Sequence, residues 1–189
     1  MAFVLAWVAP AWLLAERRGL DPLRSHGVLV RPAGLGLAAL VTLVLFGGFV
    51  AAVALVGTPV QPPPSPDALL HEGLAALAWG GLFVALPEEW LYRGVLQPAL
   101  DGPRRVRLLG ADVGRGLVLA ALLFGVAHGL YDLVVTGHVT PWRLLTAVPA
   151  LLFGWLRART GSVLVAASAH ALADALERVA GTGWTWTLP

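Results

Sequence analysis

Apolar residues along this chain form six long runs, separated by short segments that are richer in polar residues. The runs cover about residues 2–15, 33–57, 68–100, 116–131, 140–156 and 162–180. A helix needs about 20 mainly apolar residues to cross the hydrocarbon layer of a bilayer, so the first and fourth runs are short for a full crossing. The pattern predicts an all-α protein, a polytopic transmembrane helical bundle with about six spans.

Composition supports a membrane protein and excludes two other classes. Of the 189 residues, 58% are hydrophobic and only 13% are charged, whereas soluble domains contain about 25% charged residues. The apolar content and the net charge of +2 also exclude a disordered chain. Six spans leave room only for short loops, so we expect one integral membrane domain over residues 1–189.

The arginines indicate which way the spans face. All 13 basic residues are arginines, and they gather after the first, third and fifth runs. The loops at 58–67 and 132–139 contain none, and the first of these carries five prolines that favour an extended chain outside the hydrocarbon. Because cytoplasmic loops collect basic residues, both termini are predicted outside. The same distribution argues against a nucleic-acid partner, which would need a basic face.

A few ionisable residues lie inside the runs, where charge is costly and calls for a functional or pairing explanation. At about 1.5 Å per residue, their depths range from roughly 12 Å for His170 to roughly 18 Å for His128 and Asp174. Three runs therefore bring ionisable side chains to one layer of the membrane. The set consists of Glu88, Glu89, Arg93, His128, His170 and Asp174.

Spacing within the third run separates a paired carboxylate from a freer one. Glu89 and Arg93 are four residues apart, so they share a helix face and can form an ion pair. Glu88 points about 100° away and is the freer carboxylate. Pro87 precedes both glutamates, and we expect the helix to break there and restart with the glutamates in its first turn.

The histidines have potential carboxylate partners at the same spacing. Asp174 lies four residues after His170 and is expected to accept a hydrogen bond from one ring nitrogen and so fix the tautomer. Asp132 could do the same for His128, although its place near the outer end predicts a solvated residue. His71 and His138 are expected to be solvated or interfacial.

These groups suffice for hydrolysis by an activated water. A carboxylate and an imidazole, Glu88 and His128, can together remove a proton from water. A second imidazole, His170, can then donate to the oxyanion that forms when a carbonyl is attacked. No covalent nucleophile competes, since cysteine is absent and Ser168 lacks the glycine-flanked elbow of serine hydrolases.

Three motifs on three separate runs resemble the CPBP family of intramembrane glutamic-type endopeptidases, which includes the CAAX prenyl endopeptidases and the Abi proteins. The motifs occur in the family's order over nearly half of the chain. They are Glu-Glu-x-x-x-Arg at Glu88, Glu89 and Arg93, Phe-x-x-x-His at Phe124 and His128, and His-x-x-x-Asp at His170 and Asp174.

The resemblance implies a multi-pass protease of a prokaryotic cell membrane, with its motif-bearing core at about 68–180. In this family the first glutamate and the first histidine activate water, and the second histidine and its partner stabilise the oxyanion. The implied substrate is a lipidated or anchored membrane protein that is processed near its C-terminus, and membrane lipids are the other expected partners. Many members have Asn where this chain has Asp174, which as a carboxylate cannot donate and is expected to orient His170 instead.

Three alternatives stay open. Glu88, His128 and His170 could bind zinc, although the compact His-Glu-x-x-His pattern is absent and no cofactor is favoured. An ion or proton transporter would also place ionisable residues at mid-membrane, but no inverted repeat is found. A non-catalytic scaffold or immunity protein would be expected to lose a motif residue, and none is missing.

Overall fold

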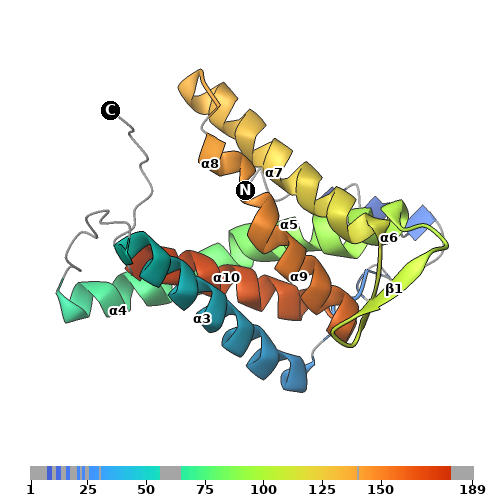
Figure 1. The fold of residues 1–189 in the computed structure, drawn as a ribbon, viewed down its shortest axis with the longest axis horizontal. Helices are drawn as coiled ribbons and strands as arrows, with labels where there is room; N and C mark the ends of the chain where they lie inside the picture. Colours follow the sequence, from blue (N-terminus) through green and yellow to red (C-terminus); the bar gives the residue numbers. More distant parts are fainter. Residues whose placement is uncertain are drawn as a thin grey trace.

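The fold is described from a computed structural model of the chain and is mostly helical (Figure 1). The structure describes residues 31–55, 65–139 and 141–179, together with residues 8–9, 12–13, 16–17, 21, 23 and 26–29. The first predicted span and the proline-rich loop at 58–64 lie largely or wholly outside these residues. The separate helices are α3 (Pro32–Leu55), α7 (Arg115–Thr136), α8 (Pro141–Leu144), α9 (Ala147–Thr160) and α10 (Val163–Val179).

The third run forms one long helix that changes its winding along its length. Its successive segments are α4 (Pro66–Ala75), the π-helical η1 (Ala76–Ala85), α5 (Leu86–Glu89), the π-helical η2 (Trp90–Leu96) and α6 (Gln97–Leu100). The predicted break at Pro87 is wrong, because the helix is continuous from Leu70 to Leu100. Proline lacks an N–H and crowds the carbonyl four residues before it. Just before Pro87, the Leu86 N–H bonds to Gly81 O, five residues back, and this wider turn accommodates the ring.

Two helices among the described residues are long and apolar enough to cross a membrane, Leu70–Leu100 and Arg115–Thr136. They correspond to the third and fourth runs, and the fourth is longer than the sequence pattern indicated. Helices α3 and α10 correspond to the second and sixth runs. The total of six spans stays a prediction.

The fifth run is not one helix but two. The short α8 ends at Leu144, and the 14-residue α9 begins at Ala147. At about 1.5 Å per residue, α9 is only about 21 Å long. Pro149 is tolerated because it lies in the first turn of α9, where backbone N–H groups have no partner within the helix.

A β-hairpin occupies the arginine-rich segment that was expected to be a plain loop. Strand β1 (Arg105–Leu108) pairs antiparallel with β2 (Ala111–Gly114), with Val106 opposite Val113. The two turn residues, Leu109 and Gly110, both have positive φ, as a tight hairpin turn of this hand requires. The indole N–H of Trp155 donates to Leu108 O at 3.0 Å, which attaches the hairpin to α9.

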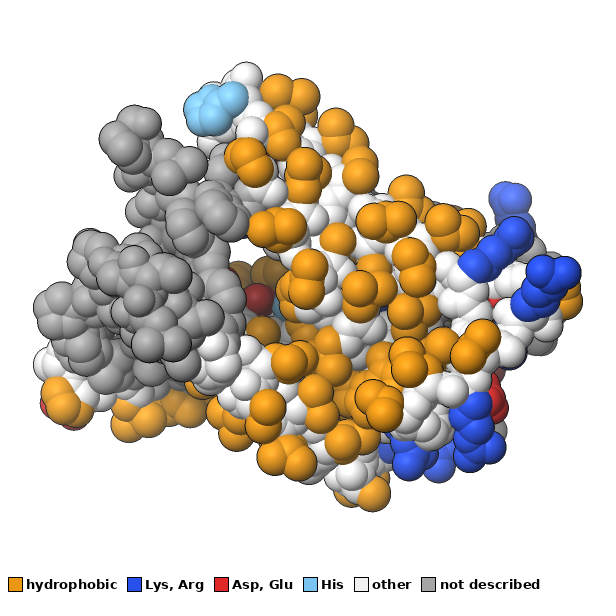
Figure 2. Space-filling model, viewed as in Figure 1, with side chains coloured by type: hydrophobic (Ala, Val, Ile, Leu, Met, Phe, Trp, Pro, Cys, Tyr) orange, Lys and Arg blue, Asp and Glu red, His pale blue; other side chains and the backbone are white. Residues whose placement is uncertain are grey.

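Helix α10 lies at the centre of the bundle and packs against α3, α9 and η1 (Figure 1). Alanines line much of its buried surface, and small residues of this kind let helices approach closely. Large apolar side chains instead cover the outer surface, as Figure 2 shows. The core around α10 contains Ala38, Phe153, Leu156, Val165, Ala166 and Ala169.

Candidate active site

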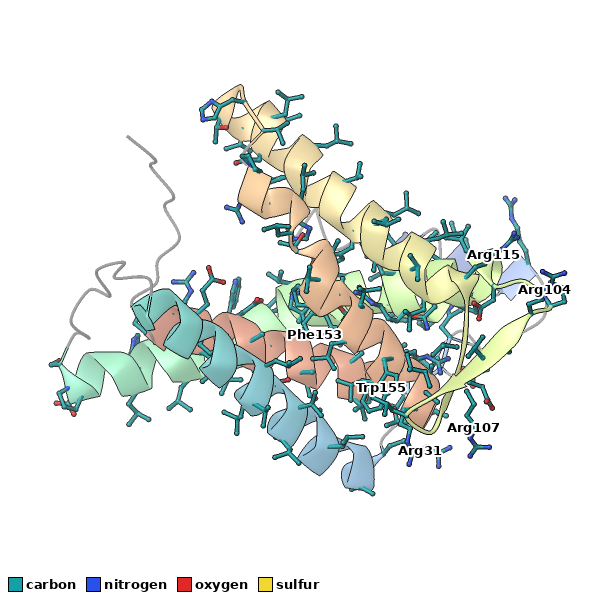
Figure 3. The ribbon with its side chains drawn as sticks, in the orientation of Figure 1. Arg31, Arg104, Arg107, Arg115, Phe153 and Trp155 are labelled. Carbon is teal, nitrogen blue, oxygen red and sulfur yellow. The ribbon has the colours of Figure 1, made fainter. Side chains whose placement is uncertain are left out.

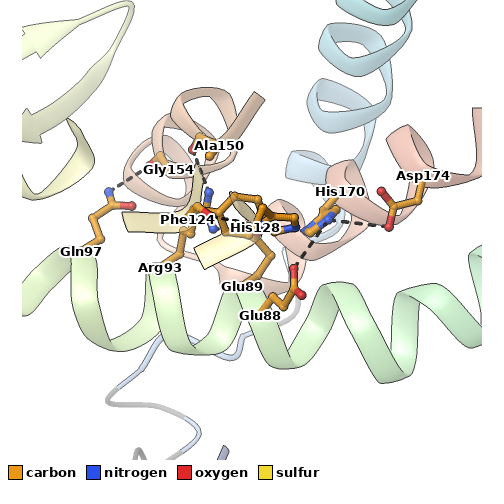
Figure 4. Close-up of polar contacts among 10 residues, drawn as sticks. All are labelled: Glu88, Glu89, Arg93, Gln97, Phe124, His128, Ala150, Gly154, His170 and Asp174. Atoms are coloured by element: carbon orange, nitrogen blue, oxygen red, sulfur yellow. Dashed lines mark hydrogen bonds and ion pairs between the residues drawn. The ribbon is translucent and has the colours of Figure 1, made fainter. Parts of the chain in front are cut away.

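The ionisable residues of three helices meet in one place, which we call the polar centre (Figure 4). The long helix contributes the two glutamates and the arginine, α7 contributes a histidine, and α10 contributes a histidine and an aspartate. Ion pairs connect five of these residues, and His128 lies beside them against the ring of Phe124. The polar centre consists of Glu88, Glu89, Arg93, His128, His170 and Asp174.

Glu89 and Arg93 form the predicted ion pair, with 3.0 Å between Oε1 and Nη1. Their side chains are 0% and 1% exposed. The arginine also donates from Nη2 to Ala150 O at 2.9 Å, and its Cζ lies 4.8 Å from the centroid of the Phe124 ring. A buried charge without such partners would be strongly destabilising, so the pair makes both residues tolerable.

His170 takes its hydrogen-bond partner from another helix. Its Nδ1 lies 3.0 Å from Glu89 Oε1, and since a carboxylate only accepts, the proton on Nδ1 is donated to Glu89. The expected hydrogen bond to Asp174 is not formed, because Asp174 Oδ2 lies 3.7 Å from Nε2, within ion-pair distance but beyond hydrogen-bond length. The i to i+4 spacing brings Asp174 to the right face of α10, but the side chain of Glu89 approaches more closely.

Nε2 of His170 therefore lies within ion-pair distance of two carboxylates but is hydrogen-bonded to neither. Glu88 Oε2 lies 4.0 Å from this nitrogen, slightly farther than Asp174. The ring of Phe153 stacks on the imidazole, with centroids 4.9 Å apart and planes 13° apart. The stacking and the bond to Glu89 hold the ring in one orientation and leave Nε2 available to a substrate.

His128 is oriented by its own helix. Its Nδ1 lies 2.9 Å from the carbonyl oxygen of Phe124, so this nitrogen must be the donor. In the neutral ring Nε2 is then the acceptor, as a general base requires. The Phe124 ring lies between the two histidines, at 4.3 Å from His128 and 5.7 Å from His170 between centroids.

Three other polar residues, on or next to α7 and on the long helix, were predicted to be solvated or interfacial, and the structure agrees for two of them. Asp132 is buried, which contradicts the prediction of a solvated residue. It lies on the same face of α7 as the buried Gly125 and Gly129, and that face packs against α8 and α9. His71 and His138 are exposed, as predicted.

Glu88 is the carboxylate that the ion pair does not use. It is buried, and its Oε2 has no hydrogen-bond partner among the described residues. Figure 2 shows a hollow in the molecular surface with an acidic side chain at its bottom. The geometry agrees with the sequence argument that Glu88 is the freer of the two glutamates.

The described residues contain no group of three or more His, Asp or Glu side chains arranged to hold a metal ion. Ser168 donates its hydroxyl to Leu164 O at 2.8 Å within its own helix. Zinc binding by Glu88, His128 and His170 stays a prediction.

Sequence analysis missed several residues that support the polar centre. Gln97 is buried and donates to Gly154 O at 3.0 Å, one helical turn beyond the contact between Arg93 and Ala150. Its spacing from Glu89 and Arg93, at i+8 and i+4, is a signal that could have identified it. Phe153 had no such signal, because its contact with His170 joins two helices.

The chain matches a known protein family over residues 70–176, which is more than half of its length. The family is described as type II CAAX prenyl endopeptidase Rce1-like, and the matched region contains all three motifs. No curated protein and no solved structure matches the chain. The chain therefore belongs to the Rce1-like family of type II CAAX prenyl endopeptidases.

Proposed function

We propose that the protein is an intramembrane endopeptidase that hydrolyses a peptide bond in a membrane-associated protein by means of an activated water. The observation that carries the proposal is the convergence of Glu88, His128 and His170 from three helices on one buried centre. Each of these side chains has an available polar atom, and the neighbouring ion pair of Glu89 and Arg93 provides support. Membership of a CAAX protease family supports the same reaction class.

In the proposed mechanism, Glu88 and His128 bind the attacking water and take its proton. Nε2 of His128 is the acceptor because Nδ1 donates to Phe124 O. The water oxygen attacks the carbonyl carbon of the scissile bond, and the carbonyl oxygen becomes an oxyanion. The proton is then delivered to the leaving amine, which completes general acid and base catalysis.

The oxyanion is stabilised by His170. Its Nε2 can donate when both ring nitrogens carry protons, since Nδ1 already donates to Glu89. The carboxylates of Glu88, Glu89 and Asp174 surround the ring and offset the charge of such an imidazolium. A prepositioned donor of this kind lowers the barrier by about 3–4 kcal/mol. Glu89, Arg93 and Asp174 act as positioning residues.

The proposed substrate is a lipidated or otherwise anchored protein that is cut near its C-terminus. The proposed topology is multi-pass, with six spans, both termini outside and the arginine-rich hairpin in the cytoplasm. The hairpin carries arginines at positions 105 and 107 and is exposed, which agrees with a location outside the hydrocarbon. The mechanism uses no metal.

The decisive experiment compares membrane proteomes of cells that produce the native protein, Glu88→Gln, or none. Glutamine keeps the size of the side chain but cannot accept a proton from water, so the rate should fall about 10²- to 10⁴-fold. Proteins cut by the native enzyme should keep their C-terminal peptides in cells with Glu88→Gln, as in cells without the protein. Quantitative mass spectrometry of those peptides at matched expression is the measurement.

Glu72→Gln is the matched control. Glu72 lies on the same long helix, but it is exposed and pairs with Arg178 at 3.5 Å, away from the polar centre. It should process substrates as the native protein does. Native processing by Glu88→Gln would refute the mechanism, and identical proteomes in all cells would shift support to the scaffold or transporter alternatives.

A further inference from the structure

Two arginines share a small hollow at the end of the bundle where α3 begins and α9 ends. Arg31 and Arg159 line this hollow of about 270 Å³ together with Thr160 and the first turns of α3. Both arginines are exposed, and neither has a carboxylate partner among the described residues. The hollow therefore presents two unneutralised guanidinium groups.

Close packing of the backbone holds the start of α3, which follows Arg31, against the end of α9, which carries Arg159. A Cβ atom at Gly34 would lie 2.8 Å from Val165 Cγ2 and 3.1 Å from Thr160 Cγ2, so only glycine lets α3 approach this closely. The loop before α3 is bonded to the start of α10, where the Val163 N–H donates to Gly27 O at 2.7 Å. The Ser162 hydroxyl donates to Leu29 O beside it. These contacts fix the backbone on both sides of Arg31 against α9 and α10.

Arg31 also lies at one end of a second, larger groove. This groove has a volume of about 610 Å³, within the range of about 300–1,000 Å³ that is usual for ligand sites. Its walls come from α3, the long helix and α10, and apart from Arg31 and Ser168 they are apolar. It extends to Leu86 and Ala171, so a ligand would have a charged end and an apolar body.

We propose that these two hollows bind one anionic phospholipid, with its phosphate between Arg31 and Arg159 and an acyl chain in the groove. Guanidinium groups bind phosphate oxygens through paired hydrogen bonds. Basic pockets between membrane helices are a known way to hold anionic headgroups. The adjoining groove distinguishes this site from a general basic surface, because only a ligand with an apolar chain fills both hollows.

The neighbouring hairpin fits a location at the membrane surface. Its tip carries Leu109, which is 80% exposed, and Val106 and Leu108 are also exposed. Figure 3 shows Arg31 and Arg107 at this end of the molecule, with Arg104 at the other end of the hairpin. Apolar residues next to arginines suit the boundary between headgroups and acyl chains.

The test is native mass spectrometry of the purified full chain in detergent. The protein is titrated with phosphatidylglycerol or with phosphatidylcholine that has the same acyl chains. We expect selective retention of one phosphatidylglycerol, and binding at least about tenfold weaker for Arg31→Gln or Arg159→Gln, because each variant loses a charged hydrogen bond to the phosphate. Arg104→Gln removes the same charge from an exposed residue that lines neither hollow, and it should bind as the native protein does.

A second variant tests the groove without changing charge. Ala78 lines the groove, so Ala78→Trp should fill it and weaken binding, while Leu74→Trp on the same helix should not. Circular dichroism would verify that each variant retains its helices. Equal loss in Arg104→Gln and Arg31→Gln, equal binding of the two lipids, or unchanged binding by Ala78→Trp would each overturn the proposal. None of these measurements depends on proteolysis.

Discussion

The two halves of the long helix Leu70–Leu100 differ in what they bury. In the first half, large apolar side chains such as Leu70, Leu74 and Trp79 are exposed. In the second half, Glu89, Arg93 and other polar residues are buried. The first half of this helix therefore exposes large apolar side chains, whereas the second half buries an acidic and a basic one.

The difference shows that a side chain of this helix is buried where it finds ion-pair or hydrogen-bond partners, and not because it is apolar. Apolar side chains have nothing to gain from the interior when the surrounding solvent is hydrocarbon. Charged groups have no water on the lipid side and must find partners inside the bundle. The second half provides them, since Arg93 forms an ion pair with Glu89 and donates to Ala150 O, and Glu89 also accepts from His170.

The largest expected effect on stability comes from breaking the ion pair of the second half. Removing one partner, as in Arg93→Leu, leaves Glu89 buried without its cation and should lower the free energy of unfolding by about 3–5 kcal/mol. The double variant Glu89→Leu with Arg93→Leu should be less destabilised than either single variant. Unfolding in mixed detergent micelles measures all four proteins, and additive losses would show that the two residues do not act as a pair.

A pair of tryptophans offers the same substitution in both halves. Trp90 is buried, and its indole N–H donates to His26 Nδ1 at 3.0 Å. Trp90→Ala should therefore cost about 3 kcal/mol of stability. Trp79 is 68% exposed and contacts Phe83, so Trp79→Ala should change stability by only about 0.5 kcal/mol. Thermal unfolding in detergent compares them, and equal shifts would contradict the contrast between the halves.

Among the buried residues of the second half, the smallest effect is expected at the end of the buried face. Gln97→Leu removes the hydrogen bond to Gly154 O but leaves an apolar side chain of similar size, so the cost should be about 1 kcal/mol. The same unfolding assay checks this value. A loss as large as that of Arg93→Leu would mean that Gln97 belongs to the ion-pair network rather than to its edge.

The sequence predicted the helices and the residues of the polar centre because both predictions rest on the spacing of residues along one helix. Runs of apolar residues indicated α3, the long helix, α7 and α10. The spacing of four residues was enough to pair Glu89 with Arg93, since a single helix sets that geometry. The same reasoning failed at Pro87, where a wider helical turn replaced the expected break, and at the hairpin, whose turn contains a leucine with positive φ.

Contacts between helices were decided only by the tertiary structure. The sequence placed Asp174 on the correct face for His170, but the rotation and spacing of α10 and the long helix brought Glu89 closer.

By itself, the sequence determined which ionisable residues lie inside the apolar runs and how they are spaced along each helix, because both follow from position along the chain. The tertiary structure decided which carboxylate orients His170 and which arginines share a hollow. The physical reason is that these choices depend on how far apart the helices pack and how they are rotated, and small residues such as Gly34 set that distance through contacts remote in sequence.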